Sequence, residues 1–470
     1  MVPPPRSRPV CWKGVLALFA VAALAAAPGR SDGEVDPTFG FNGAAVVPRI
    51  GPSESPSAMA VAPDGKIVIG GPFTASGGSF FVRRLERDGD LDGAFLDFSY
   101  SGLLRCLLVQ PDGRIVVVWD NDTDGTAARI GVIRLLPTGN PDPSFNSGAE
   151  KILDLPLDGE RARAALLAPG GKLFIASNGQ GTGILNGRPV MALTRLLDNG
   201  DPDGSWQVVN GTRLKEWNPS PEEGDGSWVD AIALDGSDRL ILAGHFRNSG
   251  FGTDLSAIGR LDLAGGFDSS FAGIGRNFVS WSGPGYPTHA HQPFGVAVLR
   301  DGRLLLASDY TRTDVVQERF GTARFTDAGI LDTTYGLQGL TYAGFEVGTT
   351  NLATAFALDA ADRPVIAGIY SDQITTIDYG VARLEPGGAG DPYFFSDGNR
   401  TFSLNSGSGD PDGAQVMALH TDGGILIAGA TWDADGMGGL TYAMVVVRLK
   451  AGLPFQDGFE SGGTSFWTTP

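Results

Sequence analysis

Three aspartates in one short segment have the spacing of a calcium-binding loop. Asp120, Asp122 and Asp124 alternate with other residues and are followed by Gly125, which allows a sharp turn. Carboxylate oxygens in this arrangement suit calcium, so we predict Asp120, Asp122 and Asp124 as a candidate calcium site. The twelfth position, where a helix-flanked calcium loop has glutamate, is Gly131, and no helical pattern flanks the segment. A solvated acidic turn is the alternative interpretation, and no other cofactor is expected.

Two of the four histidines are separated by a single residue. His289 and His291 would lie on one face of a strand, where two imidazoles can bind zinc or copper. Such a site needs a third or fourth ligand, and only His245 and His420 remain as histidines. Because glycines and prolines surround the pair, we expect a polar surface loop here.

An arginine precedes an aspartate by eight residues at six places in the chain. Catalysis needs one asymmetric arrangement of groups, whereas a pair that recurs is expected to hold a repeated unit together. We predict that each arginine ends a strand and that each aspartate orders the following turn through charge-assisted hydrogen bonds. The pairs are Arg84 with Asp92, Arg134 with Asp142, Arg195 with Asp203, Arg260 with Asp268, Arg324 with Asp332 and Arg383 with Asp391.

These pairs belong to a longer repeat. Each copy has an apolar run, a turn with Asp-Gly or a related pair, and a second apolar run, which is typical of a β-hairpin. A third stretch ending in Arg-Leu, an Asp-x-x-aromatic turn and a fourth short strand follow. Gly65 and Gly423 are equivalent turn residues six repeats apart, so the period is about 60 residues. The seven hairpins span residues 58–71, 107–119, 165–177, 231–244, 297–308, 355–368 and 416–429.

Seven repeats of four short strands predict an all-β fold, a seven-bladed β-propeller with four-stranded antiparallel blades. A linear β-solenoid is the alternative. The two ends of the repeat array favour closure, because Arg448 has no aspartate eight residues later and Asp36 has no arginine before it. We therefore predict that residues 36–49 dock beside the strand of Arg448 and close the ring.

The repeat resembles the delta-60 repeat family of bacterial surface and secreted proteins. The family pattern A-x-Q-P-D-G-K-I-x-x-A-G is matched by residues 109–119, and its L-D-x-x-F-G-x-x-G part by residues 84–95 and 35–43. Gly170 and Ser237 depart from it, because they replace the aspartate of the turn. The resemblance implies a propeller-like fold and a bacterial exported protein, and it implies no particular chemistry.

The chain divides into three segments. Residues 1–30 have the basic start and the short apolar run of a signal peptide, with cleavage expected after Ala27, Gly29 or Ser31. Residues 31–455 contain the seven units of the propeller. Residues 456–470 form a tail.

The tail resembles a D-G-F-E-S-G ending found on exported proteins of some Gram-negative bacteria. The resemblance implies a Gram-negative source and a role of the tail in secretion or surface display. A frayed terminal segment, or the remnant of an eighth repeat, is the alternative. We expect the protein to be secreted or held at the cell surface.

Charge and motifs limit the function. The net charge of −18 argues against nucleic acid and anionic membranes as partners, and no membrane span is expected after removal of the signal peptide. The sequence has no nucleophile elbow, P-loop, dinucleotide fingerprint or Cys-x-x-Cys. On this ground we predict that the chain is not an enzyme.

Two functions fit these observations. The first is a monomeric binding or scaffold module for an unknown protein or glycan ligand, with aromatic residues presented by the insertions at 178–188, 207–228 and 281–293. The alternative is a propeller hydrolase or lyase that acts on an extracellular lactone or polysaccharide with acidic side chains.

Overall fold

The computed structural model describes most of the chain between the signal-like segment and the tail. The signal-like residues 1–30, the tail 456–470, and Asp122 and Asp124 of the calcium prediction lie outside the described residues. The described ranges are 32–51, 53–73, 78–121, 129–182, 187–206, 211–218, 225–248, 253–279, 281, 288–312, 317–345, 350–371, 377–395, 397–403, 413–434 and 440–451.

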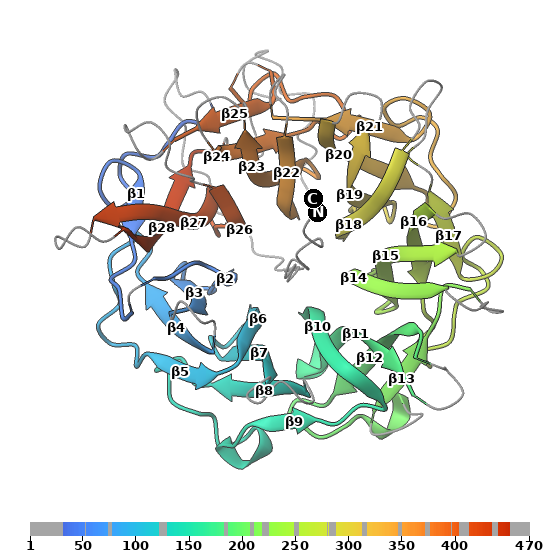
Figure 1. The fold of residues 1–470 in the computed structure, drawn as a ribbon, viewed down its shortest axis with the longest axis horizontal. Coiled ribbons are helices and arrows are strands. Elements are labelled where there is room, and N and C mark those ends of the chain that lie inside the picture. The colour runs from blue at the N-terminus through green and yellow to red at the C-terminus, as the bar shows by residue number, and fades with distance from the viewer. Residues whose placement is uncertain are drawn as a thin grey trace, which may run out of the picture.

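Seven four-stranded antiparallel blades stand around a central axis (Figure 1). In each blade the first strand is innermost, and the chain then moves outwards strand by strand. A single parallel pair of residues, Glu318 with Thr350, also joins blade 5 to blade 6. The predicted seven-bladed propeller is confirmed, and the solenoid is excluded.

The first three blades are built as follows. Blade 1 contains β2 (Ala58–Val61), β3 (Ile67–Pro72), β4 (Ser79–Leu85) and β5 (Phe98–Ser101). Blade 2 contains β6 (Leu103–Val109), β7 (Ile115–Asn121), β8 (Arg129–Leu135) and β9 (Lys151–Leu153). Blade 3 contains β10 (Leu157–Leu167), β11 (Leu173–Gly181), β12 (Pro189–Leu196) and β13 (Thr212–Lys215).

The next three blades follow the same order. Blade 4 contains β14 (Gly226–Leu234), β15 (Leu240–Asn248), β16 (Thr253–Arg260) and β17 (Arg276–Val279). Blade 5 contains β18 (Thr288–Val298), β19 (Leu304–Arg312), β20 (Gln317–Phe325) and β21 (Leu340–Ala343). Blade 6 contains β22 (Thr350–Leu358), β23 (Pro364–Ser371), β24 (Ile377–Arg383) and β25 (Asn399–Phe402).

Blade 7 is shared between the two ends of the described chain. It contains β26 (Gly413–Leu419), β27 (Ile425–Ala434) and β28 (Leu440–Leu449), and its outer strand is the N-terminal β1 (Ala44–Val46). Ala45 pairs with Val446 in an antiparallel register, as the predicted closure requires. The N-terminal and C-terminal parts of the described chain are thereby hydrogen-bonded to each other in one sheet, and this pairing closes the ring.

Helical structure in the described ranges is limited to short 3-10 turns. They are η1 (Asn146–Gly148), η2 (Pro169–Gly171) and η4 (Gly204–Trp206). In this part of the chain no helix is long and apolar enough to cross a membrane.

The Arg–Asp pairs hold the blades together, as predicted from their recurrence. Arg134 Nε lies 2.7 Å from Asp142 Oδ2, and the other five pairs are joined by the same two atoms at 2.6–2.8 Å. The guanidinium of Arg134 also covers the ring of Phe145 and donates to the Asp198 carbonyl oxygen of the next blade. Each pair therefore orders its own turn, and Arg134 also ties neighbouring blades.

Candidate functional site

The two ends of the propeller differ in how regular they are. The hairpin end carries the turns around residues such as Gly65, whose φ of +84° explains the glycine, together with the Arg–Asp pairs. The opposite end, here called the loop end, carries the links between second and third strands and the links that enter each inner strand. Repeated residues dominate the hairpin end, so differences between blades are sought at the loop end.

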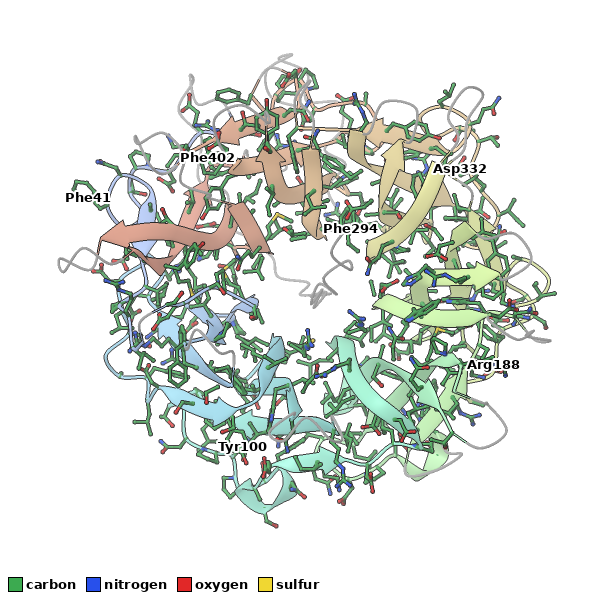
Figure 2. The ribbon with its side chains drawn as sticks, viewed as in Figure 1. Phe41, Tyr100, Arg188, Phe294, Asp332 and Phe402 are labelled. Carbon is green, nitrogen blue, oxygen red and sulfur yellow. The ribbon has the colours of Figure 1, made fainter. Side chains whose placement is uncertain are left out.

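The innermost strands of six blades share a β-bulge at one position. A register shift there leaves a single residue without a partner across the strand pair. Bulges re-aim side chains, so this position is suited to presenting different groups on one common backbone. The bulge residues are Arg105, Arg163, Asp230, Phe294, Thr354 and Gln415 in blades 2 to 7. Only in blades 2, 3 and 4 is the bulge residue charged, and Phe294 of blade 5 lies on the inner side of the ring (Figure 2).

A second position explains how the loop end holds adjacent blades together. Near the end of the second strand, Asp120 and Asn178 each accept the backbone N–H that precedes the bulge of the next blade. The distances are 2.9 Å to Ala162 N and 2.9 Å to Val229 N. Asp309 of blade 5 makes the same contact at 3.2 Å. These contacts, here called clasps, satisfy buried backbone donors and join blades 2 to 3, 3 to 4 and 5 to 6.

Blade 4 departs from the clasp. The equivalent side chain is His245, and the residue of blade 5 that would supply the N–H is Pro293, which has none. His245 Nδ1 instead lies 2.6 Å from Oδ2 of Asp230, the bulge residue of its own blade. Because Pro293 has no N–H, the side chain at position 245 does not have to accept a hydrogen bond from blade 5. The imidazole of His245 is paired with the Asp230 carboxylate instead.

Charged residues of blades 2 and 3 lie next to the His245–Asp230 pair of blade 4. Arg105 Nη2 lies 2.6 Å from Asp120 Oδ2, and Arg161 Nη1 lies 3.6 Å from the same oxygen. Arg163 interacts electrostatically with Asp230, Arg105, Asp120 and Arg161. The strands β6, β10 and β14 that carry most of these residues are neighbours around the axis (Figure 1). The inner-rim cluster is defined as Arg105, Asp120, Arg161, Arg163, Asp230 and His245.

The cluster is cationic in an acidic protein. It contains three guanidinium groups and two carboxylates, whereas the whole chain has a net charge of −18. Asp120, Asp230 and Arg105 are buried, whereas the side chain of Arg161 is 36% exposed, so Arg161 is the most accessible of these four residues. Burial lowers the pKa of Arg163, and the nearby Asp230 carboxylate opposes this shift.

An aromatic ring fixes the plane of the imidazole. Trp228 stacks on His245 with ring centroids 4.7 Å apart and planes 9° apart. Arg247 lies 5.6 Å from the Trp228 ring on β15, and its guanidinium is held by Asp254 at 2.8 and 3.0 Å. Because Asp230 holds Nδ1 and Trp228 holds the ring plane, the imidazole is oriented for proton transfer through its other nitrogen.

The predicted calcium site is described only in part. The Asp120 carboxylate is fully buried and is occupied by Arg105 and by the Ala162 N–H. Asp122 and Asp124 lie outside the described residues, so the calcium site stays a prediction. Within the described ranges no group of three or more His, Cys, Asp or Glu side chains could hold a metal ion.

The two neighbouring histidines lie on a strand and not in the expected loop. His289 and His291 both belong to β18, and a register shift separates them. The extended backbone overrides the local glycines and prolines because β18 pairs with β19 along its whole length.

Glu160 is a buried carboxyl group of the same region with a structural role. Its Oε1 accepts the Leu155 N–H at 3.1 Å, and burial raises its pKa to about 7. Ser227 and Asn351 occupy the equivalent position in blades 4 and 6. They accept N–H groups of their own entering links at 2.9 Å. Glu160 therefore belongs to a repeated contact and not to the inner-rim cluster.

A hollow of about 560 Å³ lies elsewhere, between the outer parts of blades 1 and 2. Its lining contains hydroxyl groups but no acid–base pair, so it is a weaker candidate than the inner-rim cluster. Phe73, Ser79, Ser99, Tyr100, Ser101 and Asn121 line it.

Sequence reasoning missed all of the cluster except Asp120. The signal is present in the repeats, because alignment of the seven turns places Arg105, Arg163 and Asp230 in one column and Asp120 and His245 in another. A repeat position at which the residue type changes from blade to blade is where a functional residue should be sought, because the conserved positions of the repeat maintain the fold.

Comparison with known proteins supports the fold. A family described as "Domain of unknown function (DUF5122) beta-propeller" matches residues 62–95 and 110–145, which are parts of blades 1 and 2. No curated protein is significantly similar to the chain.

Several solved structures are similar at low identity. A protein of unknown function from Dyadobacter fermentans is 11% identical, with a TM-score of 0.41 over 87% of this chain and 98% of its own. The GH93 alpha-L-arabinofuranosidase of Fusarium graminearum is 12% identical, with a TM-score of 0.41 over 73% and 91%. A PL25 ulvan lyase is 13% identical, with a TM-score of 0.43 over 74% and 80%.

These comparisons correct the prediction that the chain is not an enzyme. The solved structures that they retrieve include a glycosidase and a polysaccharide lyase. The prediction was wrong because it relied on missing sequence motifs, and those motifs belong to other folds. At these identities the similarity concerns the fold alone: this chain is a seven-bladed β-propeller that contains segments matching the DUF5122 beta-propeller description.

Proposed function

We propose that the protein is a propeller enzyme of the hydrolase or lyase class, with the inner-rim cluster as its active site. The observation that carries the proposal is the 2.6 Å contact between His245 Nδ1 and Asp230 Oδ2, at the one clasp position where Pro293 removes the need for a clasp. A His–Asp pair at this position occurs once in the described blades. The other described His–Asp contact, His420 Nδ1 to Asp422 Oδ1 at 2.7 Å, lies in the hairpin turn of blade 7 with a fully buried imidazole.

In this proposal His245 transfers the proton. Asp230 accepts the Nδ1–H, which leaves the lone pair of Nε2 to remove a proton from a water molecule or from the substrate. Asp230 also stabilises the imidazolium that forms. Hydrolysis of a lactone or polysaccharide and elimination in a polysaccharide both begin with such a step, and the reaction needs no cofactor.

The substrate is proposed to be extracellular. The signal-like segment at 1–30 supports export. Trp228 adds an aromatic face next to His245, which suits contact with a sugar ring or a lactone.

A screen with matched variants tests the proposal. The mature chain is assayed on a panel of polysaccharides and lactones, with reducing ends, unsaturated products and released acid as separate readouts. We expect His245→Asn to lower kcat by about 100-fold or more on any active substrate. Asn178→Ala is the control, because it removes a clasp at the equivalent position of blade 3 and should retain kcat below its melting temperature. Full activity of His245→Asn would contradict the proposal.

A further inference from the structure

We propose that three cations at the outer edge of blades 3 and 4 bind a tetrahedral oxyanion, a sulfate or phosphate group. They are Arg213, Lys215 and Arg276, here called the outer cation cluster. Arg213 and Lys215 lie on β13, the outermost strand of blade 3, and Arg276 begins β17, the outermost strand of blade 4 (Figure 1). The inner-rim cluster lies on first and second strands, so this is a separate site and does not depend on the proposed function.

The ring of Phe267 brings two of these cations together from different blades. Lys215 Nζ lies 5.3 Å from the ring centroid, and Arg276 Cζ lies 4.8 Å from it. Arg213 is two positions before Lys215 on the same face of β13, and its Nε donates to the Trp206 carbonyl oxygen at 2.7 Å. Both arginines act electrostatically on Lys215, so three positive charges lie close together at this boundary between blades.

Lys215 and Arg276 have no anionic partner in the described part of the chain. Neither side chain makes an ion pair or a hydrogen bond there. Arg276 is only 8% exposed, and its Nε has no hydrogen-bond partner among the described residues. Buried charges in proteins are normally paired, because an unpaired charge has lost its hydration without compensation. The contacts with the neutral Phe267 ring offset part of this loss, and an anion would offset more.

The electrostatics of the cluster favour an added negative charge. Burial is the main reason that the pKa of Lys215 is lowered, and Arg213 and Arg276 lower it further. Asp262 opposes this shift, but its carboxylate accepts two backbone N–H groups of its own turn at 2.9 and 2.8 Å. Burial also lowers the pKa of Arg276. A bound anion would restore the counter-charge that both cations lack.

The repeat itself does not require a cation at either position. In five other blades the position of Lys215 in the outermost strand holds an aromatic or aliphatic side chain, namely Tyr100, Leu153, Val279, Ala343 and Phe402. In four other blades the position of Arg276 is uncharged, with Ala44, Thr212, Leu340 and Asn399. Two cations that occur once in their repeat positions and meet at one ring are therefore not explained by the fold.

The geometry of the donors favours a tetrahedral oxyanion over a carboxylate. The ammonium of Lys215 is a point charge with three donors, and the guanidinium groups of Arg213 and Arg276 come from separate strands. A sulfate or phosphate group has at least three oxygens that accept hydrogen bonds from different directions, whereas the two oxygens of a carboxylate lie in one plane. The half-buried Lys215 and Arg213 leave the cluster open to such a group from solvent.

A thermal-shift experiment tests this inference without any activity. The mature chain is melted with inorganic sulfate, inorganic phosphate, glucose 6-sulfate or acetate at one ionic strength, set with sodium chloride. We expect a sulfate or phosphate group to raise the Tm by about 2–3 °C at saturating concentration and acetate to act like chloride. A larger shift with glucose 6-sulfate would identify an ester as the ligand, and a shift with the inorganic ions alone would identify the free ion. An acetate shift of equal size, or no shift with any oxyanion, would overturn the site.

Variants localise the effect, because sulfate also stabilises proteins through its exclusion from their surface. Lys215→Leu and Arg276→Thr introduce residues that other blades have at these positions, so the blades should still form. Both variants should lose the oxyanion shift. Lys151→Leu is the matched control and should keep it, since Lys151 is a half-buried lysine on β9, the outermost strand of blade 2. An unchanged shift in both cluster variants would overturn the site.

The melts in chloride alone separate a ligand site from a structural contact. Lys215→Leu should melt at or above the wild-type temperature, because it removes an unpaired, half-buried charge and leaves an apolar side chain on Phe267. A Tm more than about 2 °C below the wild type, with the oxyanion shift retained, would show that the cations only stabilise the fold and would overturn the proposal.

Discussion

Asp36 Oδ2 lies 3.2 Å from Arg448 Nε, although 412 positions separate the two residues in the chain. This contact is the same Arg–Asp pair that each of the other six blades makes between residues eight positions apart. In blade 7 its two members come from opposite ends of the described chain. The Arg448 N–H also donates to the Gly43 carbonyl oxygen, and β1 pairs with β28 beside it. The ring is therefore closed by backbone pairing and by the same ion pair that orders the other turns.

Removal of residues 31–50 should open the ring. The deletion removes β1 and Asp36, and it leaves β28 as an unpaired edge strand with exposed backbone groups. We expect the Tm to fall by more than about 5 °C and aggregation to increase, as measured by differential scanning fluorimetry and light scattering.

The matched deletion is residues 457–470, which lie outside the seven repeats. It should change the Tm by less than about 2 °C. A closure role for β1 is wrong if the two truncated chains melt at the same temperature.

Acid should unfold the protein through its turn aspartates. Burial alone would raise the pKa of Asp92, but hydrogen bonds from Lys66, Ala94 N and Arg84 outweigh it and lower the pKa to about 2. The Ser270 hydrogen bond is the main reason that the pKa of Asp268 is also lowered to about 2. Because the folded pKa lies below the unfolded one, this stability is present above about pH 4 and is lost as the pH falls through about 2.

Thermal melts from about pH 5 to pH 2 measure this loss. Asp92→Asn should be less stable than the wild type at neutral pH and should lose less stability on acidification. Asp88→Asn, which alters an exposed aspartate of the preceding turn, is the control and should follow the wild type. Parallel curves for Asp92→Asn and the wild type would show that the pair does not set the acid limit.

Glu160 should make the loop end less stable at alkaline pH. Burial raises its pKa from 4.5 to about 7, so the folded state binds the proton more tightly than the unfolded state does. The stabilisation is complete below about pH 4.5 and is lost as the pH rises through about 7. Glu160→Gln keeps a neutral side chain, so its Tm relative to the wild type should increase between pH 5 and pH 8.

The control for Glu160 is Asp158→Asn, an exposed position on the same strand. Its Tm difference from the wild type should not vary over this pH range. A pH-independent difference for Glu160→Gln would mean that the carboxyl group is not held in its protonated form.

The missing clasp of blade 4 should be restorable by two substitutions. Pro293→Ala supplies a buried N–H with no acceptor, which should cost about 1–3 kcal/mol of unfolding free energy. His245→Asn alone supplies an acceptor with no donor. Together they recreate the contact that Asn178 makes with Val229, so a double-mutant cycle should show a favourable coupling of about 0.5–3 kcal/mol.

Chemical denaturation of the four proteins in the cycle gives this coupling. Additive effects of the two substitutions would contradict the explanation of why His245 is available. Asn178→Ala should lose a similar amount of stability in its own blade and serves as the reference for the size of a clasp.

The fold could be predicted because its determinants recur at fixed short spacings. The turn glycines, the Arg–Asp pairs and the aromatic residues that follow them appear in nearly every unit, and the eight-residue spacing keeps each pair within one turn. The closure could be predicted for the same reason, since Asp36 and Arg448 are the two unmatched members of this set.

The candidate site could not be predicted in the same way. Its contacts join residues on different strands and, for Arg161 with Asp120, on different blades, and each residue type occurs once or twice in its column. Asp120 illustrates the difficulty, because its sequence neighbours Asp122 and Asp124 suggested calcium. Its carboxylate is held by Arg105, fifteen positions earlier, through strand pairing that a sequence motif does not show.

The most direct test is a crystal structure of the His245→Asn variant with an oligosaccharide substrate from the panel bound. We expect a sugar ring beside Trp228 and position 245, at the inner-rim cluster. An oligosaccharide bound at the hairpin end, or in the hollow between blades 1 and 2 with the inner-rim cluster empty, would contradict the proposed active site.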